Sequence, residues 1–132
     1  MTDEDRRRVL AGARILVVED EMMAASMLEM VLGDCGCIVV GPVPSIESGL
    51  ALAEDGPIDA AVLDVNLAGE PVFPIADVLS AKHVPFVFVT GYGAPGVDGK
   101  RYPGAPVVQK PYDDDALVRI VADQIHERRS RP

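Results

Sequence analysis

Cysteine is nearly absent from this sequence, since Cys35 and Cys37 are the only two among 132 residues. A structural zinc site uses four cysteine or histidine ligands, and His83 and His126 have no spacing that suggests a site shared with the cysteines. Two cysteines also give no disulfide framework. We therefore interpret both as small buried side chains, which argues against the zinc-binding and disulfide-rich classes of protein.

Long hydrophobic runs are missing as well. No apolar stretch reaches the roughly 18 residues that a membrane span needs. The charged residues 3–8 are not followed by the apolar core of a signal peptide. These absences predict a cytoplasmic protein that does not work at a membrane.

Basic charge is scarce, because Lys and Arg number 12 against 21 Asp and Glu, for a net charge of −9. A nucleic-acid binder normally carries a basic face, so we expect no direct contact with nucleic acid. The acidity instead suits a cluster of carboxylates that awaits a cation. The length and the 48% hydrophobic content fit one globular domain.

Five short apolar runs alternate with helical patterns along the chain. The runs do not alternate polar with apolar residues, so both faces of each strand should be buried, as in a parallel sheet covered by helices on both sides. Right-handed crossovers then predict a doubly wound α/β fold. The expected strands are residues 15–18, 37–40, 58–63, 86–89 and 106–109, and the expected helices are residues 21–32, 45–54, 72–82 and 113–128.

The connection between Thr90 and Pro106 departs from this pattern. It contains five glycines and two prolines, which cost about 1 and about 3 kcal/mol respectively in a helix interior. We expect the fourth helix to be short or absent. We also expect residues 1–11 to be a flexible tail, residues 12–128 to form the domain, and residues 129–132 to be a C-terminal tail.

Polar residues end four of the five apolar runs. The first run is followed by Glu19 and Asp20, the third by Asp64, the fourth by Thr90 and the fifth by Lys110. In an open parallel sheet, ligands bind at the carboxyl ends of the strands. We therefore expect three carboxylates, a hydroxyl and an ammonium group to meet in one crevice.

These residue types point to phosphoryl chemistry. Close carboxylates repel one another unless a cation joins them, and an all-oxygen acidic cluster suits Mg²⁺, which binds a few carboxylates plus a phosphate. Asp64, on the middle strand, is the candidate phosphoryl acceptor. Lys110 and Thr90 are candidates for holding two other phosphoryl oxygens, because phosphoryl transfer needs mainly positioning and charge neutralisation.

The ordered set of Glu19-Asp20, Asp64, Thr90 and Lys110-Pro111 resembles the signature of a response-regulator receiver domain, and the match covers about residues 12–128. The resemblance implies a flavodoxin-like five-stranded parallel sheet with strand order 2-1-3-4-5. It also implies that Asp64 is the phosphoacceptor and that Thr90 and Lys110 bind the phosphoryl group.

The resemblance implies a metal site too. Asp20 and Asp64 resemble direct Mg²⁺ ligands, with the backbone carbonyl of Asn66 as a third, and Glu19 resembles the acidic partner that acts on the metal, often through water. The implied function is that of a single-domain response regulator, which accepts its phosphoryl group from a histidine kinase or a histidine phosphotransfer protein. Such a protein signals by protein contact or serves as a phosphate shuttle or sink. It is not an enzyme beyond its own phosphorylation and dephosphorylation.

A narrower resemblance concerns residues 88–93, Phe-Val-Thr-Gly-Tyr-Gly, and residues 66–74. Both are similar to the "FAT GUY" subgroup of receivers, although Val89 stands where alanine is usual. This subgroup implies a kinase of the HWE or HisKA2 type. Typical receivers carry Tyr or Phe where this chain has Val107, so we expect Tyr92 and the glycine-rich loop to form the switch instead.

The helix expected over residues 21–32 is apolar over an arc wider than the roughly 100° stripe that faces a core. One interpretation is a wide core contact. The other is that Met23, Met27 and Met30 form a surface for a partner helix, since methionine suits adaptable surfaces.

Two other functions compete with the signalling module. A phosphatase of the haloacid dehalogenase type also uses a strand-end Asp, but it needs a second Asp two residues later, where this chain has Asn66. A pseudo-receiver would bind partners without phosphorylation, which the intact acidic set argues against.

Overall fold

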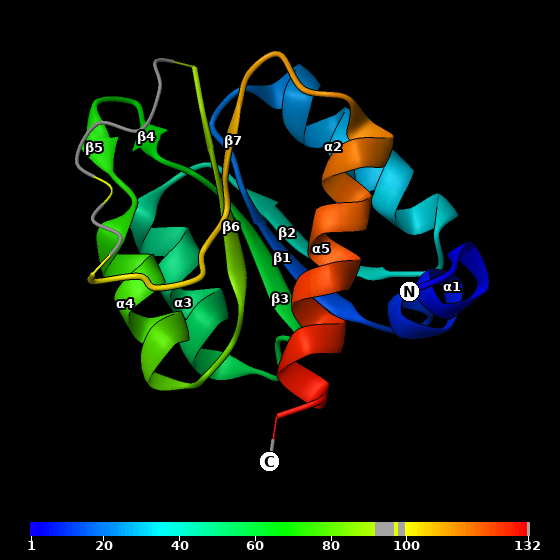
Figure 1. Ribbon diagram of the computed structural model, residues 1–132. Helices are drawn as coiled ribbons and strands as arrows, with labels where there is room; N and C mark the ends of the chain where they lie inside the picture. The colour runs from blue at the N-terminus through cyan, green and yellow to red at the C-terminus, as the bar shows by residue number, and fades with distance from the viewer. Residues whose placement is uncertain (92–96, 98–99, 132) are drawn as a thin grey trace.

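A computed structural model of the protein describes residues 1–91, 97 and 100–131 (Figure 1). It is a central parallel sheet covered by helices on both faces. The elements, in chain order, are α1 (Asp3–Leu10), β1 (Arg14–Val18), α2 (Met22–Asp34), β2 (Ile38–Val43), α3 (Ile46–Asp55), β3 (Ala60–Asp64), β4 (Asn66–Leu67), β5 (Glu70–Pro71), α4 (Phe73–Ala81), β6 (Phe86–Thr90), β7 (Val107–Gln109) and α5 (Asp114–Arg129).

The main sheet has the strand order β2-β1-β3-β6-β7, and all its strands are parallel. Counted along the chain, this is the order 2-1-3-4-5, so the predicted flavodoxin-like fold is confirmed. Helices α3 and α4 cover one face, and α1, α2 and α5 cover the other (Figure 1). The described residues of the fourth connection, 91, 97 and 100–106, form no helix, in agreement with the glycine and proline content there.

The two faces of the sheet carry separate cores. In β1, Leu16 and Val18 pack with α3 and α4, while Ile15 and Val17 pack with α2 and α5. The central strands β3 and β6 are buried at every residue, whereas the edge strands β2 and β7 are partly exposed. This two-sided burial is why the apolar runs do not alternate.

Tyr102, in the described part of the fourth connection, packs into the core between the sheet and helices α3 and α4. It is only 4% exposed, and its hydroxyl donates a hydrogen bond of 2.8 Å to Asp77 Oδ1. Burial, with the help of that carboxylate, raises the pKa of Tyr102. The ring is surrounded by three phenylalanines, Phe73, Phe86 and Phe88.

Residues 3–10, which the sequence predicted to be part of a flexible tail over residues 1–11, form helix α1. Helix α1 begins with a capping box in which Thr2 and Asp5 exchange hydrogen bonds of 3.0 Å. Leu10 is 3% exposed and belongs to the core that α5 also lines. Docking against α5 gives this eight-residue helix the stability that its length alone would not provide.

At the other end of the chain, α5 reaches Arg129, one residue beyond the predicted domain boundary. Cys37 is buried, and burial raises the pKa of its thiol to about 11. Both cysteines are free. None of the helices in the described residues has the length and apolarity of a membrane span.

We expect Gly41→Ala to destabilise the fold by about 3 kcal/mol. Gly41 has φ +97°, and an added Cβ would lie 2.9 Å from the backbone nitrogen of Val43 and 3.0 Å from the carbonyl oxygen of Val17. The control is Gly56→Ala, because Gly56 is extended and has no atom within 4 Å of such a Cβ. Urea unfolding of both variants measures the difference. Equal midpoints would contradict this explanation of Gly41.

Candidate functional site

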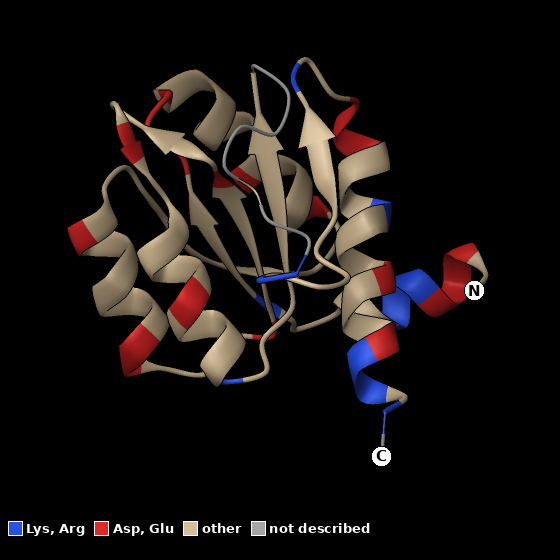
Figure 2. Ribbon diagram, turned by 60° about the vertical axis from the view of Figure 1, so that its left-hand side comes forward, with Lys and Arg blue, Asp and Glu red and all other residues tan. Residues whose placement is uncertain are grey.

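The register of the parallel strands sets the carboxyl ends side by side. Val18 of β1 pairs with Leu63 of β3, and Asp64 pairs with Val89 of β6. Glu19 and Asp20 follow β1 directly, and Lys110 follows β7. The expected convergence on one edge of the sheet is therefore present, and Figure 2 shows acidic residues near the carboxyl ends of the strands.

Glu19, Asp20 and Asp64 form an acidic cluster. One carboxylate oxygen from each lies within 4.8 Å of the others. Glu19 and Asp64 are each 6% exposed, whereas Asp20 is exposed. Buried negative charges at this separation need compensating cations.

Lys110 supplies one of these cations. Its Nζ lies 2.6 Å from Glu19 Oε1 and 3.2 Å from Asp64 Oδ2. Its backbone N–H donates to the carbonyl of Thr90 at 2.7 Å, which fixes the end of β7 against β6. Burial lowers the pKa of Lys110, but the hydrogen bond to Glu19 and the charges of Asp64 and Glu19 outweigh it, so the pKa is raised.

One ammonium does not balance three carboxylates. The pKa of Glu19 is raised, first by burial and then by its hydrogen bond with Asp64, in spite of Lys110. Burial is the main cause of this rise, and the neighbouring Asp64 carboxylate adds to it. The donor set therefore fits a hard, oxygen-binding divalent cation such as Mg²⁺.

Backbone N–H groups hold two of the carboxylates in position. The N–H of Asn66 donates to Asp64 Oδ1 at 3.2 Å, and the N–H of Ala68 donates to Asp20 Oδ2 at 3.0 Å. Both donors belong to the β4–β5 hairpin. Its two-residue loop, Ala68 and Gly69, has φ values of +51° and +91°, as a tight hairpin turn requires.

The side chain of Asn66 is committed to this hairpin, because its Oδ1 accepts a hydrogen bond of 2.7 Å from the N–H of Gly69. The backbone carbonyl of Asn66 stays a predicted metal ligand. Thr90 is 4% exposed and ends β6, one residue beyond the partner of Asp64 in the register.

Sequence reasoning did not single out the hairpin, since two-residue strands leave almost no periodic signal. The one sequence feature that indicates a tight turn here is Gly69, three residues after Asn66, because glycine readily adopts positive φ. Of the switch candidates, Tyr92 lies outside the described residues, and Val107 is 39% exposed at the start of the edge strand β7.

The interpretation of α2 as a wide core contact was wrong for its methionines. Met23, Met27 and Met30 are 75%, 51% and 60% exposed. The buried residues of α2 are Ala25, Leu28 and Leu32. The partner-surface interpretation of the methionines stays a prediction.

We expect the stability difference between the wild type and Glu19→Gln to depend on pH in metal-free protein. The pKa of Glu19 is raised above its ordinary value of 4.5 in the folded state. The protonated Glu19 carboxyl therefore stabilises the folded state below pH 4.5. This stabilisation is lost as the pH rises through the pKa of Glu19 in the folded protein.

The stability of Glu19→Gln relative to the wild type should accordingly increase as the pH rises from 4.5 to neutrality. Denaturant unfolding in a chelator at several pH values measures this difference. The control is Glu29→Gln, on the exposed side of α2, which should show no such trend. A stability difference between Glu19→Gln and the wild type that does not change with pH would contradict the raised pKa of Glu19.

No family model matches the sequence. Among solved structures, SdrG from Sphingomonas melonis is 42% identical, with a TM-score of 0.74 over 87% of this chain and 97% of that one. The BeF3-activated conformation of SdrG is 43% identical, with a TM-score of 0.70 over 87% and 98% of the two chains.

Two further structures share the fold. A response regulator receiver protein from Sinorhizobium medicae has a TM-score of 0.81 at 24% identity, over 90% of this chain and 98% of that one. The receiver domain of the sensor histidine kinase PA1611 from Pseudomonas aeruginosa, solved with magnesium in its active-site cleft, has a TM-score of 0.74 at 24% identity, over 88% and 99%.

Curated relatives include the sensory transduction protein LytT of Bacillus cereus, which is 25% identical over 121 residues, or 89% of this chain and 49% of LytT. The chain spans about half the length of the curated relatives that it matches.

Proposed function

Because this chain belongs to the family of response-regulator receiver domains, we propose that it takes a phosphoryl group onto Asp64 in a Mg²⁺-dependent reaction. Phosphoryl acceptance is general for the family. The observation that carries the proposal is the buried Asp64 carboxylate, which ends the central strand between two acidic neighbours and the Lys110 ammonium.

Asp64 is suited to be the nucleophile. A carboxylate oxygen would form a bond to phosphorus while the bond from phosphorus to the donor nitrogen breaks, and the electron pair stays with the donor histidine. The N–H of Asn66 orients Oδ1, and Lys110 contacts Oδ2. The position of the nucleophile is thus set before a donor arrives.

Glu19, Asp20, Asp64 and the backbone carbonyl of Asn66 would hold the Mg²⁺ ion. When bound, Mg²⁺ neutralises charge that develops on the phosphoryl oxygens. Lys110 would exchange its contact with Asp64 for a phosphoryl oxygen, and the Thr90 hydroxyl would bind another. These residues supply the charge neutralisation and positioning that phosphoryl transfer requires.

The phosphodonor is proposed to be a histidine kinase, of the HWE or HisKA2 type, or a histidine phosphotransfer protein. We further propose that the phosphorylated chain signals through protein contact or passes phosphate on. The activated conformation solved for SdrG with BeF3, at 43% identity, supports a phosphorylation-dependent state.

Intact mass spectrometry tests the proposal. Protein incubated with a small phosphodonor and Mg²⁺ should gain the mass of one phosphoryl group, and protein incubated with the donor and a chelator should not. No mass gain with Mg²⁺ would favour the pseudo-receiver function. Continuous turnover of a generic phosphate ester would favour the phosphatase.

We propose that the exposed methionines of α2 face the phosphodonor. Met27 and Ala24 line a cavity of about 390 Å³ together with Lys110 and Tyr112. The cavity therefore lies between Met27, one of the exposed methionines of α2, and Lys110 of the phosphoryl site.

Met27→Glu should slow phosphotransfer from a kinase about tenfold, because it buries a charge in the contact. Uptake from a small phosphodonor should not change, and this separates docking from chemistry. Equal rates of kinase transfer in wild type and variant would contradict the proposed surface.

A further inference from the structure

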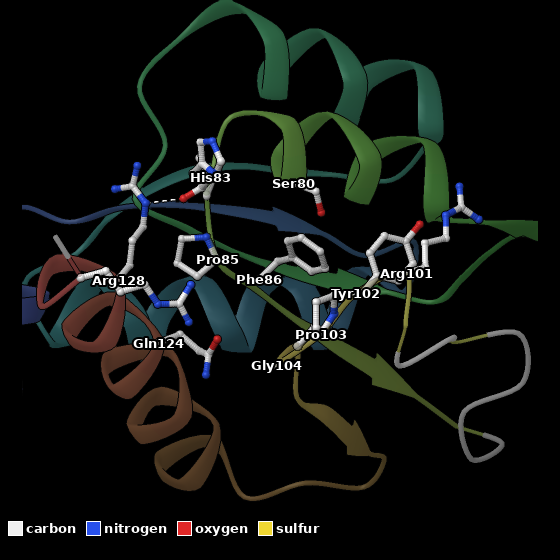
Figure 3. A pocket seen from close by; sticks show the side chains of 13 residues that line it. Ser80, His83, Pro85, Phe86, Arg101, Tyr102, Pro103, Gly104, Gln124 and Arg128 are labelled. Atoms are coloured by element: carbon white, nitrogen blue, oxygen red, sulfur yellow. Dashed lines mark hydrogen bonds between the residues drawn. The ribbon is translucent and has the colours of Figure 1, made fainter.

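A cavity of about 720 Å³ (Figure 3) lies near the start of β6, whereas Asp64 stands at the carboxyl end of β3. Its lining includes Phe86, the first residue of β6, and Ala105, just before β7. Arg128, in the last turn of α5, also contributes. The volume lies within the range of sites that bind small ligands or peptide side chains, and the proposed phosphorylation uses none of these residues.

One wall of the cavity is a rigid turn. The N–H of Ala105 donates to the carbonyl of Tyr102 at 3.2 Å. Pro103 is the second residue of this turn, and Gly104, with φ +80°, is the third. Proline and a left-handed glycine in these positions fit a type II turn. Since the Tyr102 ring is anchored in the core, the wall is formed before any ligand binds, which favours affinity.

The opposite wall is the end of α4. His83 has φ +59°, and its N–H donates to Ser80 while the N–H of Val84 donates to Leu79, as in a Schellman motif. This conformation presents the His83 carbonyl to α5, where Nε of Arg128 donates to it (Figure 3). The Arg128 guanidinium is thereby held at the rim of the cavity.

The cavity is cationic in an acidic protein. Three arginines and no carboxylate are among the described residues that line it. Arg101 is paired with Asp77 at 2.5 Å, and Arg131 lies 3.4 Å from the exposed Glu127. Arg128 has no ion pair with any carboxylate in the described part of the chain. Figure 2 shows basic residues at the C-terminal end of α5.

Basic residues in the last turn of a helix also balance the helix macrodipole. That explanation suffices for Arg129, which does not line the cavity. It does not explain why Arg128 and Arg131 stand beside an apolar floor that includes Pro85 and Phe86. The combination of cations and apolar surface points to a ligand with both kinds of group.

We propose that this cavity binds an acidic peptide segment of a partner protein. Carboxylates of the segment would contact Arg128 and Arg131, with the Gln124 amide as a further donor. An apolar side chain would lie on the apolar floor of the cavity, between Pro85 and Pro103 (Figure 3). Arginine binds carboxylates through paired, charge-assisted hydrogen bonds, which gives such a contact its specificity.

A peptide fits better than a nucleotide. A nucleobase needs an open aromatic face for stacking, and Phe86 and Tyr102 are only 6% and 4% exposed. An apolar side chain needs only a hollow with apolar walls, which the two prolines provide.

A titration followed by backbone amide NMR tests the proposal. The probe is a capped hexapeptide, Glu-Glu-Leu-Phe-Glu-Glu, and its control has Gln at every Glu position. We expect saturable shifts at the residues that line the cavity, and binding of the Gln peptide at least about tenfold weaker. Shifts confined to other surfaces, or equal binding of both peptides, would overturn the proposal. So would binding at this cavity by ATP or by anionic lipid vesicles but not by the peptide.

Three arginine variants sharpen this test. Arg128→Gln and Arg131→Gln should each weaken the Glu peptide about tenfold, whereas Arg129→Gln should bind like the wild type. Arg131 follows the end of α5 and makes an exposed ion pair with Glu127, so its loss should leave the fold intact even if the loss of Arg128 does not. Equal affinity in Arg131→Gln and Arg129→Gln would overturn the proposal. Phosphoryl uptake by Asp64 should be the same in all three.

Discussion

Asp64→Asn is expected to lose phosphoryl uptake, by at least about a hundredfold, while keeping the fold. The amide oxygen is a far weaker nucleophile than a carboxylate, and the amide nitrogen cannot attack phosphorus usefully. The change conserves the shape of a side chain that is 6% exposed. The Lys110 ammonium loses one ionic partner but keeps Glu19 at 2.6 Å.

The stability of Asp64→Asn distinguishes lost chemistry from lost structure. The variant removes one of two adjacent buried carboxylates, and repulsion between them contributes to the raised pKa of Glu19. In metal-free protein we therefore expect Asp64→Asn to be at least as stable as the wild type. Intact mass measures uptake, and urea unfolding measures stability.

The control for Asp64→Asn is Asp55→Asn, at the exposed end of α3. It changes the net charge by the same amount and should take up phosphate like the wild type. A phosphoryl group that persists in Asp64→Asn would place the acceptor elsewhere. Loss of uptake in both variants would indicate a general effect of charge.

The sheet and its active edge were predictable because burial constrains them strongly. β3 and β6 are buried on both sides, so their sequences are continuous apolar runs, and a polar residue marks where each run leaves the core. Asp64 and Thr90 stand at such points. The rule that parallel strands end at the same edge of a sheet then predicted that Glu19, Asp20 and Lys110 lie near them.

The N-terminal helix was missed because most of its residues are charged. Its capping box, Thr2 with Asp5, is visible in the sequence, but a cap alone does not stabilise an eight-residue helix. The decisive contribution is the burial of Leu10 against the core beneath α5. Two adjacent apolar residues, Val9 and Leu10, give no periodic signal, so this contact was not predictable from the local pattern.

The methionines of α2 illustrate a second limit. Periodicity shows that a helix is apolar over a wide arc, but not how much of that arc its neighbours cover. In the structure, α2 buries Leu28 and Leu32 against the sheet and α5, and Met23 and Met27 stay outside this contact. The exposed fraction depends on how α5 lies against α2, which the pattern of α2 does not contain.

Lys110→Met is expected to lower phosphoryl uptake about a hundredfold, since removal of one preorganised donor typically has an effect of this size. Methionine keeps most of the length and the apolar stem of lysine but has no charge. In metal-free protein the variant should also be less stable, because Glu19 and Asp64 then lack their nearest cation. Lys110→Arg is the matched control, which should keep the charge and much of the stability but place the donors differently.

The destabilisation by Lys110→Met should itself depend on pH. The Lys110 ammonium lowers the pKa of Glu19, so this pKa should rise further when the ammonium is removed. A protonated Glu19 no longer repels Asp64, so the loss of stability is small near pH 4.5 and grows as the pH rises through the new pKa of Glu19.

Added Mg²⁺ should reduce the loss at neutral pH, because it supplies positive charge to the same oxygens. Unfolding curves at both pH values, with Mg²⁺ and with a chelator, measure these four conditions. A loss of stability that is the same in all four would mean that Lys110 acts through packing and not through its charge.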